Sequence, residues 1–324
     1  MIRIHSRPVA TWPFFVAIAV TTMMSPAVHA EDEMKPFVLA STSIGTVADH
    51  VEGVKTTLTD ADFEIVGEYS PYPNAHIVVV TNSDLTRAAI NHNRAGYIAG
   101  QRVSITKVSD EVTLAGDQIQ IAYTNPRYMA AAYRIDTDLP GVAEKLEEAL
   151  GAEVEFGPDK GLTAEKLMKY HYTFGMEYFD EPHQLASHDS YEEAIDIVEK
   201  NLEAQTAGVS KVYRIDIPGA KQTVFGVSMK ATGEIKNKYM DETYIMGEID
   251  FKPVRSTAHL PYEILVNGGD VEALHARFRI AMNFPDLSMM GSNSFMNIMP
   301  SPDAIKEALT LVAGGEFEEV EEEL

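Results

Sequence analysis

Two stretches of the chain repeat the same order of residue types. Residues 101–129 align with residues 260–288 without a gap, and Pro126 falls opposite Pro285. Each copy predicts a strand, a short polar turn, a second strand and a proline-marked corner, because apolar runs on both sides of a polar turn are typical of a β-hairpin. We interpret the repeat as a duplication, which constrains both the fold class and the domain boundary.

Strand and helix patterns flank both hairpins in the same order. In the first copy, strands are expected over residues 37–44, 63–69, 76–81, 103–108 and 118–123, and helices over 47–58, 84–91 and 142–150. In the second copy, strands are expected over residues 172–179, 209–217, 223–229, 260–266 and 274–282, and helices from the capping residue Ser190 and over 303–312.

These patterns favour an α+β fold. Because the strands come in hairpins, a doubly wound parallel sheet is disfavoured. We expect two tandem, duplicated domains, each with an antiparallel sheet covered by helices on one face. Two such units in one chain are expected to pack as a pseudo-twofold pair that imitates a homodimer.

The predicted organisation has five segments. They are a signal peptide over residues 1–30, a first α+β domain over 35–156, a linker over 157–169, a second α+β domain over 170–315 and an acidic tail over 316–324. The second copy carries an insertion at residues 230–257, and its sequence does not distinguish a lid from a surface strand pair.

The N-terminal residues carry an export pattern. Arg3 and Arg7 precede an apolar stretch over residues 12–24, small residues follow at 27–30, and acidic residues begin at Glu31. This order is typical of a cleaved secretory signal. The alternative, an uncleaved anchor, needs an apolar run of about 20 residues. We therefore expect a periplasmic or secreted protein without an integral membrane segment after cleavage.

Composition excludes several classes of function. The formal net charge of −23 at pH 7 disfavours nucleic acid and anionic lipid as partners, because phosphate binding needs a basic face. The chain has no cysteine, which excludes iron–sulfur clusters, thiolate zinc and thiol catalysis. Without disulfides, an exported protein has to rely on its apolar core.

Three segments of the first copy resemble a known family. Residues 58–66 (LTDADFEIV), 101–108 and 123–126 (YTNP) are similar to the corresponding segments of the domain-of-unknown-function 302 family. The resemblance covers residues 37–134 and, less closely, residues 172–312, and Asp62 stands where the family usually has glycine. It implies a small α+β fold that tends to pair. The family has no established reaction, so the resemblance assigns no catalytic residue.

A methionine-rich run follows the second hairpin. Met289, Met290, Met296 and Met299 fall within eleven residues, and thioether sulfur is a soft ligand suited to Cu(I). These four residues are candidate metal ligands, with copper as the cofactor. The alternative, which we favour, is that the methionines fill gaps in the core after the Pro285 corner.

Two histidines flank the second hairpin. If the strands pair around the Asn267-Gly268-Gly269 turn, His259 and His275 become neighbours and add imidazole ligands to a metal site. The alternative is that both are half-exposed strand histidines without a ligand.

Two arginines and two tyrosines are candidate ligand-binding residues. Arg277 and Arg279 are predicted to share one face of a strand, where they would bind a carboxylate or phosphate or instead form salt bridges with Glu263. Tyr123 and Tyr128 are suited to a ligand site, because each side chain combines an apolar ring with a polar hydroxyl. Packing between the copies is the commoner role for such residues.

No catalytic motif accompanies these residues: the chain lacks G-x-S-x-G, P-loop, H-E-x-x-H and G-x-G-x-x-G patterns. The expected function is therefore a secreted periplasmic binding or interaction protein for an unknown small molecule or protein, with self-association possible. The alternatives are a copper-handling protein and an enzyme of unknown reaction.

Overall fold

The computed structural model describes residues 32–90, 92–108, 118–231 and 237–316. Its contacts group the chain from Asp32 onward into one compact unit. The predicted signal peptide and almost all of the predicted acidic tail lie outside the described residues. Among the helices in the described ranges, none combines the length and the hydropathy needed to cross a bilayer.

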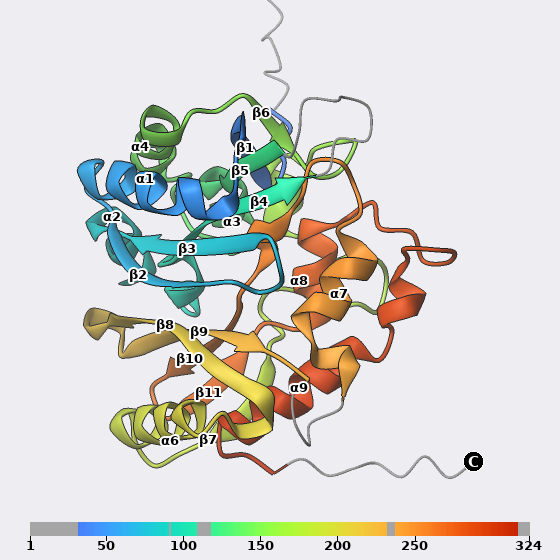
Figure 1. The fold of residues 1–324 in the computed structure, drawn as a ribbon. Coiled ribbons are helices and arrows are strands. Elements are labelled where there is room, and N and C mark those ends of the chain that lie inside the picture. Colours follow the sequence, from blue (N-terminus) through green and yellow to red (C-terminus); the bar gives the residue numbers. More distant parts are fainter. Residues whose placement is uncertain (1–31, 91, 109–117, 232–236, 317–324) are drawn as a thin grey trace, which may run out of the picture. The chain divides into compact units, whose positions relative to one another are not determined.

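The strands of the described residues form one antiparallel sheet of eleven (Figure 1). From one edge to the other its order is β6 (Val154–Phe156), β1 (Phe37–Ile44), β5 (Gln118–Thr124), β4 (Gln101–Val108), β3 (Ala75–Thr81), β2 (Glu64–Tyr69), β8 (Val209–Ile217), β9 (Gln222–Met229), β10 (Tyr262–Asn267), β11 (Asp270–Ala273) and β7 (His183–Ser187).

The two halves of the sheet have the same strand order in reverse. The order β1-β5-β4-β3-β2 in the first half corresponds to β7-β11-β10-β9-β8 in the second. The halves meet at β2 and β8, which pair through Gly67 and Tyr213. The strands of both copies therefore join into one continuous sheet, where the sequence predicted a separate sheet for each domain.

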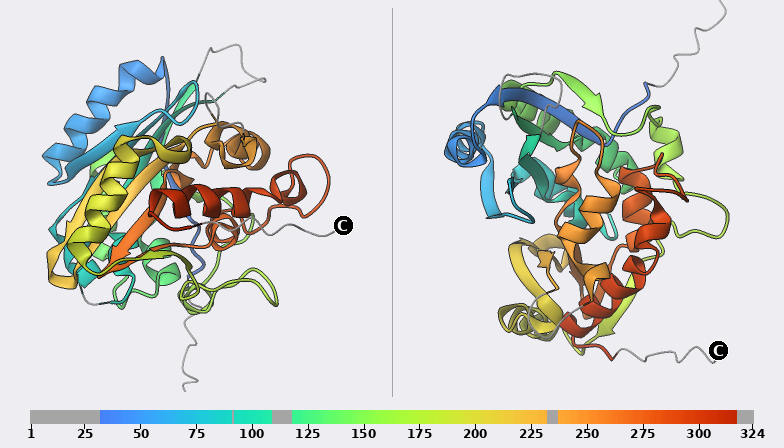
Figure 2. Two further views of the ribbon diagram at one scale, coloured as in Figure 1. Left: turned by 90° about the horizontal axis from the view of Figure 1, so that it is seen from below. Right: turned by 45° about the vertical axis from the view of Figure 1, so that its right-hand side comes forward.

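Nine α-helices of the described residues pack around this sheet. They are α1 (Val47–Asp60), α2 (Ser83–Ile90), α3 (Pro126–Ala132), α4 (Pro140–Leu150), α5 (Ala164–Met168), α6 (Tyr191–Glu203), α7 (Glu242–Ile249), α8 (Ala276–Asn283) and α9 (Ser301–Val312). Helix α1 contacts β2, β3 and β4, and α6 contacts β8, β10 and β11. Figure 2 shows α1 and α6 along one side of the sheet, with α7 and α9 on the other.

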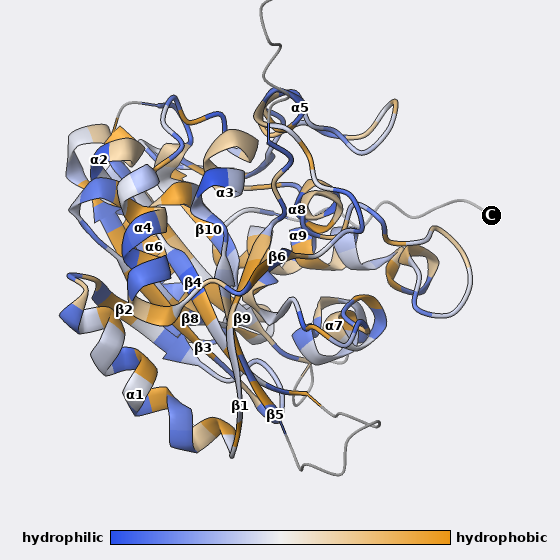
Figure 3. Ribbon diagram, turned by 90° about the horizontal axis from the view of Figure 1, so that it is seen from above, coloured by the Kyte–Doolittle hydropathy of each residue, from blue (hydrophilic) through white to orange (hydrophobic). Residues whose placement is uncertain are grey.

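Burial follows from this layering. Every residue of β9 is buried, which requires cover on both faces, whereas the sequence predicted cover on one. Helix α1 buries only Val54 and Leu58, as expected for an amphipathic surface helix. Figure 3 accordingly shows several central strands largely in the hydrophobic colours and α1 with both colours.

Much of the predicted strand pattern is confirmed. The strand predicted over residues 37–44 is β1, and the first hairpin is β4 and β5. The predicted cap at Ser190 is also present, since its hydroxyl accepts a hydrogen bond from the Glu193 backbone N–H at 3.1 Å. Helix α2 instead starts one residue earlier than expected, where the Asn82 side chain accepts the N–H groups of Asp84 and Leu85.

The second hairpin departs from its prediction. Strand β11 ends at Ala273, and the expected strand over residues 274–282 is mostly helix α8. The apolar residues of this segment alternate as in a strand, although they form a helix. Because α8 is buried on nearly all sides, its apolar residues are not confined to one stripe. The ungapped alignment therefore fails beyond β10: Pro126 begins α3, whereas Pro285 follows α8.

Two other predicted segments also differ. Residues 172–179 form no strand, and the outer strand of the second half is β7 instead. In the insertion, residues 232–236 lie outside the described residues, and the remainder contains a 3₁₀ helix (Lys238–Met240) and α7. The described part is thus not a strand pair. The predicted linker contains α5, which packs against α3.

A buried ion pair shows that the sheet curls. Arg102 on β4 and Glu263 on β10 lie five strands apart, a separation of about 24 Å in a flat sheet. Yet Arg102 Nη2 lies 2.5 Å from a Glu263 oxygen, and both side chains are almost fully buried. Two side chains cannot span the flat distance, so the sheet must bend until its concave face brings them together.

Tyr213 occupies the space between these charges. It pairs with Gly67 on β2 and with Gly226 on β9, and Gly226 pairs in turn with Glu263. The phenol ring of Tyr213 occupies the position that a Cβ on residue 226 would take. The Tyr213 hydroxyl donates to Glu263 at 2.5 Å. Glycine at position 226 therefore allows Tyr213 to reach the ion pair from the boundary between the halves.

Candidate functional site

The two candidate arginines lie on α8 and have different surroundings. Arg277 is near the surface, where its guanidinium donates to Glu177 at 2.7 Å. Arg279 is buried and donates to the backbone oxygens of His259 and Pro261. The prediction of one shared strand face is therefore wrong. The predicted partner Glu263 pairs with Arg102 on another strand instead.

The two candidate histidines are not neighbours across a hairpin. His259 lies in a 3₁₀ helix (Thr257–His259), fully buried, with its Nδ1 2.8 Å from the Asn283 side chain. His275 caps α8 and stacks on His183 with 3.8 Å between ring centroids. The expected hairpin geometry fails because α8 starts where the second strand was predicted.

Neither nitrogen of His275 is left for a metal ion. Its Nδ1 accepts the backbone N–H of Arg277 at 3.3 Å, and its Nε2 lies 3.1 Å from Glu177. Burial and then the charge of Arg277 lower the pKa of His275 to about 4, so the ring is neutral near pH 7. Within the described residues, no three or more His, Asp or Glu side chains cluster so that they could hold a metal ion.

The candidate tyrosines are structural. Tyr123 on β5 is buried and donates to the Gly151 carbonyl at 3.2 Å. Tyr128 on α3 is buried and donates to the Met282 carbonyl on α8 at 2.6 Å. Tyr128 therefore connects helices of the two halves, which matches the packing role considered for it.

The four candidate methionines are exposed. Met289, Met290, Met296 and Met299 have exposed fractions of 45, 72, 51 and 55%. The favoured interpretation, that they fill the core, is therefore wrong. They lie on the loop that follows α8, where backbone hydrogen bonds such as Met296 N–H to Met289 O at 3.2 Å hold the chain in a compact turn.

An apolar pocket lies beside this loop. It is a shallow hollow lined by Tyr172, Met176, Arg277, Ile280, Ala281, Phe284, Leu287, Met289 and Phe295. Helix α8 supplies one wall, and the methionine loop supplies another. Arg277 is its one charged lining residue. The pocket brings the candidate residues Arg277 and Met289 together with aromatic residues that include Tyr172 and Phe284.

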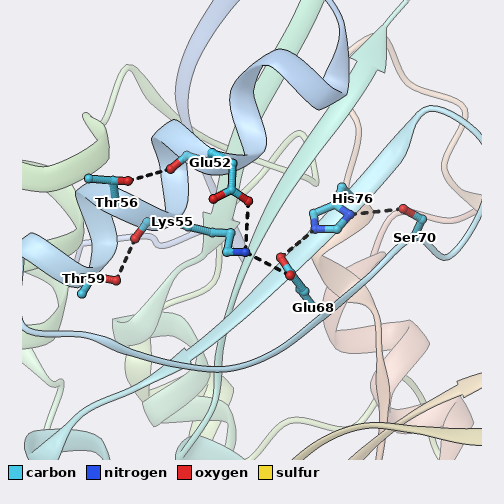
Figure 4. A network of polar contacts seen from close by, with 7 residues as sticks. All are labelled: Glu52, Lys55, Thr56, Thr59, Glu68, Ser70 and His76. Atoms are coloured by element: carbon cyan, nitrogen blue, oxygen red, sulfur yellow. Dashed lines mark hydrogen bonds and ion pairs between the residues drawn. The ribbon is translucent and has the colours of Figure 1, made fainter.

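A polar cluster on the β2–β3 hairpin is not among the sites that the sequence predicted. Figure 4 shows His76 between Glu68 and Ser70: its Nδ1 lies 3.2 Å from the Ser70 hydroxyl and its Nε2 lies 3.3 Å from Glu68. Lys55 of α1 also donates to Glu68, at 3.0 Å. The strands expected over residues 63–69 and 76–81 could have indicated this cluster, because the short turn between them brings Ser70 and His76 together.

Two carboxyl groups are buried on the α7 side of the molecule. Glu242 accepts the Tyr69 hydroxyl at 3.0 Å, and Asp250 accepts the Ser256 backbone N–H at 2.9 Å. Burial raises the pKa of Glu242 to about 8 and that of Asp250 to about 7. Both groups therefore retain protons at a pH at which they are ionised in the unfolded chain.

This difference predicts a pH dependence of stability. Between pH 6.5 and 8 the folded state binds more protons than the unfolded state, so the free energy of unfolding should fall as pH rises, by up to about 1.4 kcal/mol per pH unit for each group. Glu242→Gln should remove the slope above pH 7, leaving only the part due to Asp250 below it. Urea unfolding at a series of pH values measures both. An unchanged slope in the variant would contradict the assignment.

No family model, curated protein or solved structure matches this chain.

Proposed function

We propose that the protein binds a small apolar molecule carrying a carboxylate in the pocket between α8 and the methionine loop. The observation that carries the proposal is the apolar lining with Arg277 as its one charged member. Ligand pockets are typically apolar with a few placed polar groups. Arg277 Nη2 donates to Glu177, and the other guanidinium N–H groups are suited to donate to a ligand carboxylate.

The exposed side chains around the pocket support this function. Met289 lines the pocket and is 45% exposed, and leaving it in water forgoes about 25 cal/mol for each Å² of apolar surface. Methionine also adapts its flexible side chain to irregular ligands, which suits a pocket that accepts several related acids.

The wider setting of this binding protein is also part of the proposal. The reversed strand order of the two halves supports an origin by duplication, with the halves arranged as a pseudo-twofold pair. The N-terminal pattern of Arg3, Arg7 and the apolar residues 12–24 supports export to the periplasm or beyond. The resemblance of residues 37–134 to the domain-of-unknown-function 302 family is consistent with a fold that pairs.

A fluorescent apolar acid tests the pocket. We expect 1-anilinonaphthalene-8-sulfonate, whose sulfonate stands in for the carboxylate, to bind the folded protein at one site. Met289→Gln should weaken binding about tenfold, which corresponds to about 1.4 kcal/mol of lost apolar contact. The matched control is Met299→Gln, because Met299 is similarly exposed but does not line the pocket. Equal affinities for the wild type and Met289→Gln would contradict the proposed site.

Copper binding is the second candidate function, and one observation favours it: all four thioethers of the methionine loop are accessible to a metal ion. The same pair of variants separates the two functions. If Cu(I) is the ligand, Met289→Gln and Met299→Gln should both weaken binding of Cu(I), or of Ag(I) as its substitute. If the pocket binds only an apolar acid, neither substitution should alter a metal titration.

A further inference from the structure

The Ser70, His76 and Glu68 side chains are arranged as a nucleophile, a base and an orienting carboxylate. Strand β2 ends at Tyr69 and β3 starts at Ala75, so the turn returns the chain beside itself. The Ser70 hydroxyl lies 3.2 Å from His76 Nδ1, and Glu68 lies 3.3 Å from His76 Nε2 (Figure 4). Both distances are long for hydrogen bonds but are typical of a site without substrate.

The charge on Glu68 suits an orienting role. Burial acts to raise the pKa of Glu68, but the hydrogen bonds from Lys55 and His76 outweigh it and leave the pKa below its usual value. Glu68 is therefore ionised at neutral pH. An ionised carboxylate on Nε2 holds the ring proton there, which leaves Nδ1 as the acceptor that faces the Ser70 hydroxyl.

The three residues stand at a groove that a substrate can enter. Ser70 is exposed, and both Ser70 and His76 line an open groove. The walls of the groove include Thr46 before α1, Tyr72 in the turn, and Lys230 and Thr243 on the far side. Lys230 is a cation on the same groove, and a cation can stabilise an oxyanion that develops on the substrate.

We propose that Ser70 and His76 form a hydrolytic site for uncharged carboxylic esters. Ser70 Oγ attacks the carbonyl carbon while His76 Nδ1 takes the hydroxyl proton. The bond from that carbon to the alcohol oxygen breaks, and His76 returns the proton to the departing alcohol. Water then attacks the Ser70 ester with His76 as base, which releases the acid and restores the hydroxyl. The net charge of −23 repels anionic esters, which is why the substrate is uncharged.

The chain contains a second serine–histidine pair that serves as an internal control. The Ser43 hydroxyl lies 3.2 Å from His50 Nε2. Within the described residues, no carboxylate forms an ion pair with His50, whereas Glu68 pairs with His76. If the carboxylate and the groove matter, Ser70 should be reactive and Ser43 should not.

The test uses the full chain with p-nitrophenyl butyrate as substrate and a fluorophosphonate as a covalent probe. We expect ester hydrolysis, and a single labelled peptide that mass spectrometry maps to Ser70. Ser70→Ala should reduce kcat/KM at least about a hundredfold, the lower range for general-base catalysis, whereas Ser43→Ala should leave it unchanged. Both serines are partly or fully exposed, so neither change should alter unfolding in urea by more than about 0.5 kcal/mol.

Glu68 is a positioning residue, so its variant needs a different readout. Glu68→Gln should lower kcat more than it raises KM, because the amide no longer fixes the ring proton of His76 on Nε2. Three results would overturn the proposal: hydrolysis no faster than that by free imidazole at the same concentration, labelling at a residue other than Ser70, or undiminished activity in Ser70→Ala.

Discussion

Replacing Arg102 by methionine is expected to lower the free energy of unfolding by about 3–5 kcal/mol, because the change leaves a buried charge without its partner. Arg102 is 2% exposed and Glu263 is 3% exposed. Without the guanidinium at 2.5 Å, the side-chain hydrogen bond that the Glu263 carboxylate retains within the described residues is that from the Tyr213 hydroxyl. Desolvation of that carboxylate is then no longer offset, so the folded state loses a large part of its margin over the unfolded state.

Urea unfolding with a double-mutant cycle tests this prediction. Arg102→Met combined with Glu263→Gln should recover most of the lost stability, since the neutral amide has a smaller desolvation cost. Arg87→Met is the matched control: Arg87 also pairs with an acid, Asp84, but its side chain is 68% exposed, and exposed pairs contribute about 0–1 kcal/mol. Additive effects of Arg102→Met and Glu263→Gln would show that the two charges are not coupled.

Gly226→Ala is expected to destabilise the fold by about 3 kcal/mol or to prevent folding. A Cβ at this position would lie 1.9 Å from Tyr213 Cε1 and 2.2 Å from Cδ1, far inside van der Waals contact. The ring is enclosed on β8 between the two halves, so relief requires a shift of strands, and overpacking of this kind costs about 1–3 kcal/mol or more.

Thermal unfolding of two further variants isolates the clash. Gly247→Ala on α7 is the control, because nothing lies within 4 Å of its added Cβ, and alanine should stabilise the helix by about 0.5–1 kcal/mol. Tyr213→Ala removes the ring, so adding Gly226→Ala to that variant should cost much less than it does alone. A similar cost in both backgrounds would rule out the ring as the cause.

Local patterns account for the parts of the fold that the sequence predicted. β1 and the β4–β5 hairpin alternate clearly, and short turns connect β2 to β3 and β8 to β9, so the sequence carries their signals directly. The pattern fails at α8, because a helix buried on nearly all sides has no polar stripe. The pairing of Arg102 with Glu263 also escapes prediction, since it depends on the curvature of the whole sheet.

The candidate site was predicted only in part for the same reason. The residue types of Arg277 and Met289 drew attention to them, and both line the pocket. The sequence did not place Tyr172 and Phe284 beside them, because residues 172–179 and 274–282 carry patterns that predict strands. The exposure of the methionines was also unpredictable, since a run of apolar residues contains no information about which segments cover it.

The boundary between the halves has a consequence for assembly. In the described residues, the backbone of β2 and β8 pairs at one position only, Gly67 with Tyr213, so side chains on the concave face supply much of the cohesion across it. A molecule that opens there presents two unsatisfied strand edges, and such edges template pairing with another chain. Two opened molecules can exchange halves and close again as an intertwined dimer with the same contacts. Arg102, Tyr213 and Glu263 are among the residues that join the halves, as are Tyr128 through the Met282 carbonyl and Gln120 through the Arg255 backbone, and such contacts oppose domain swapping.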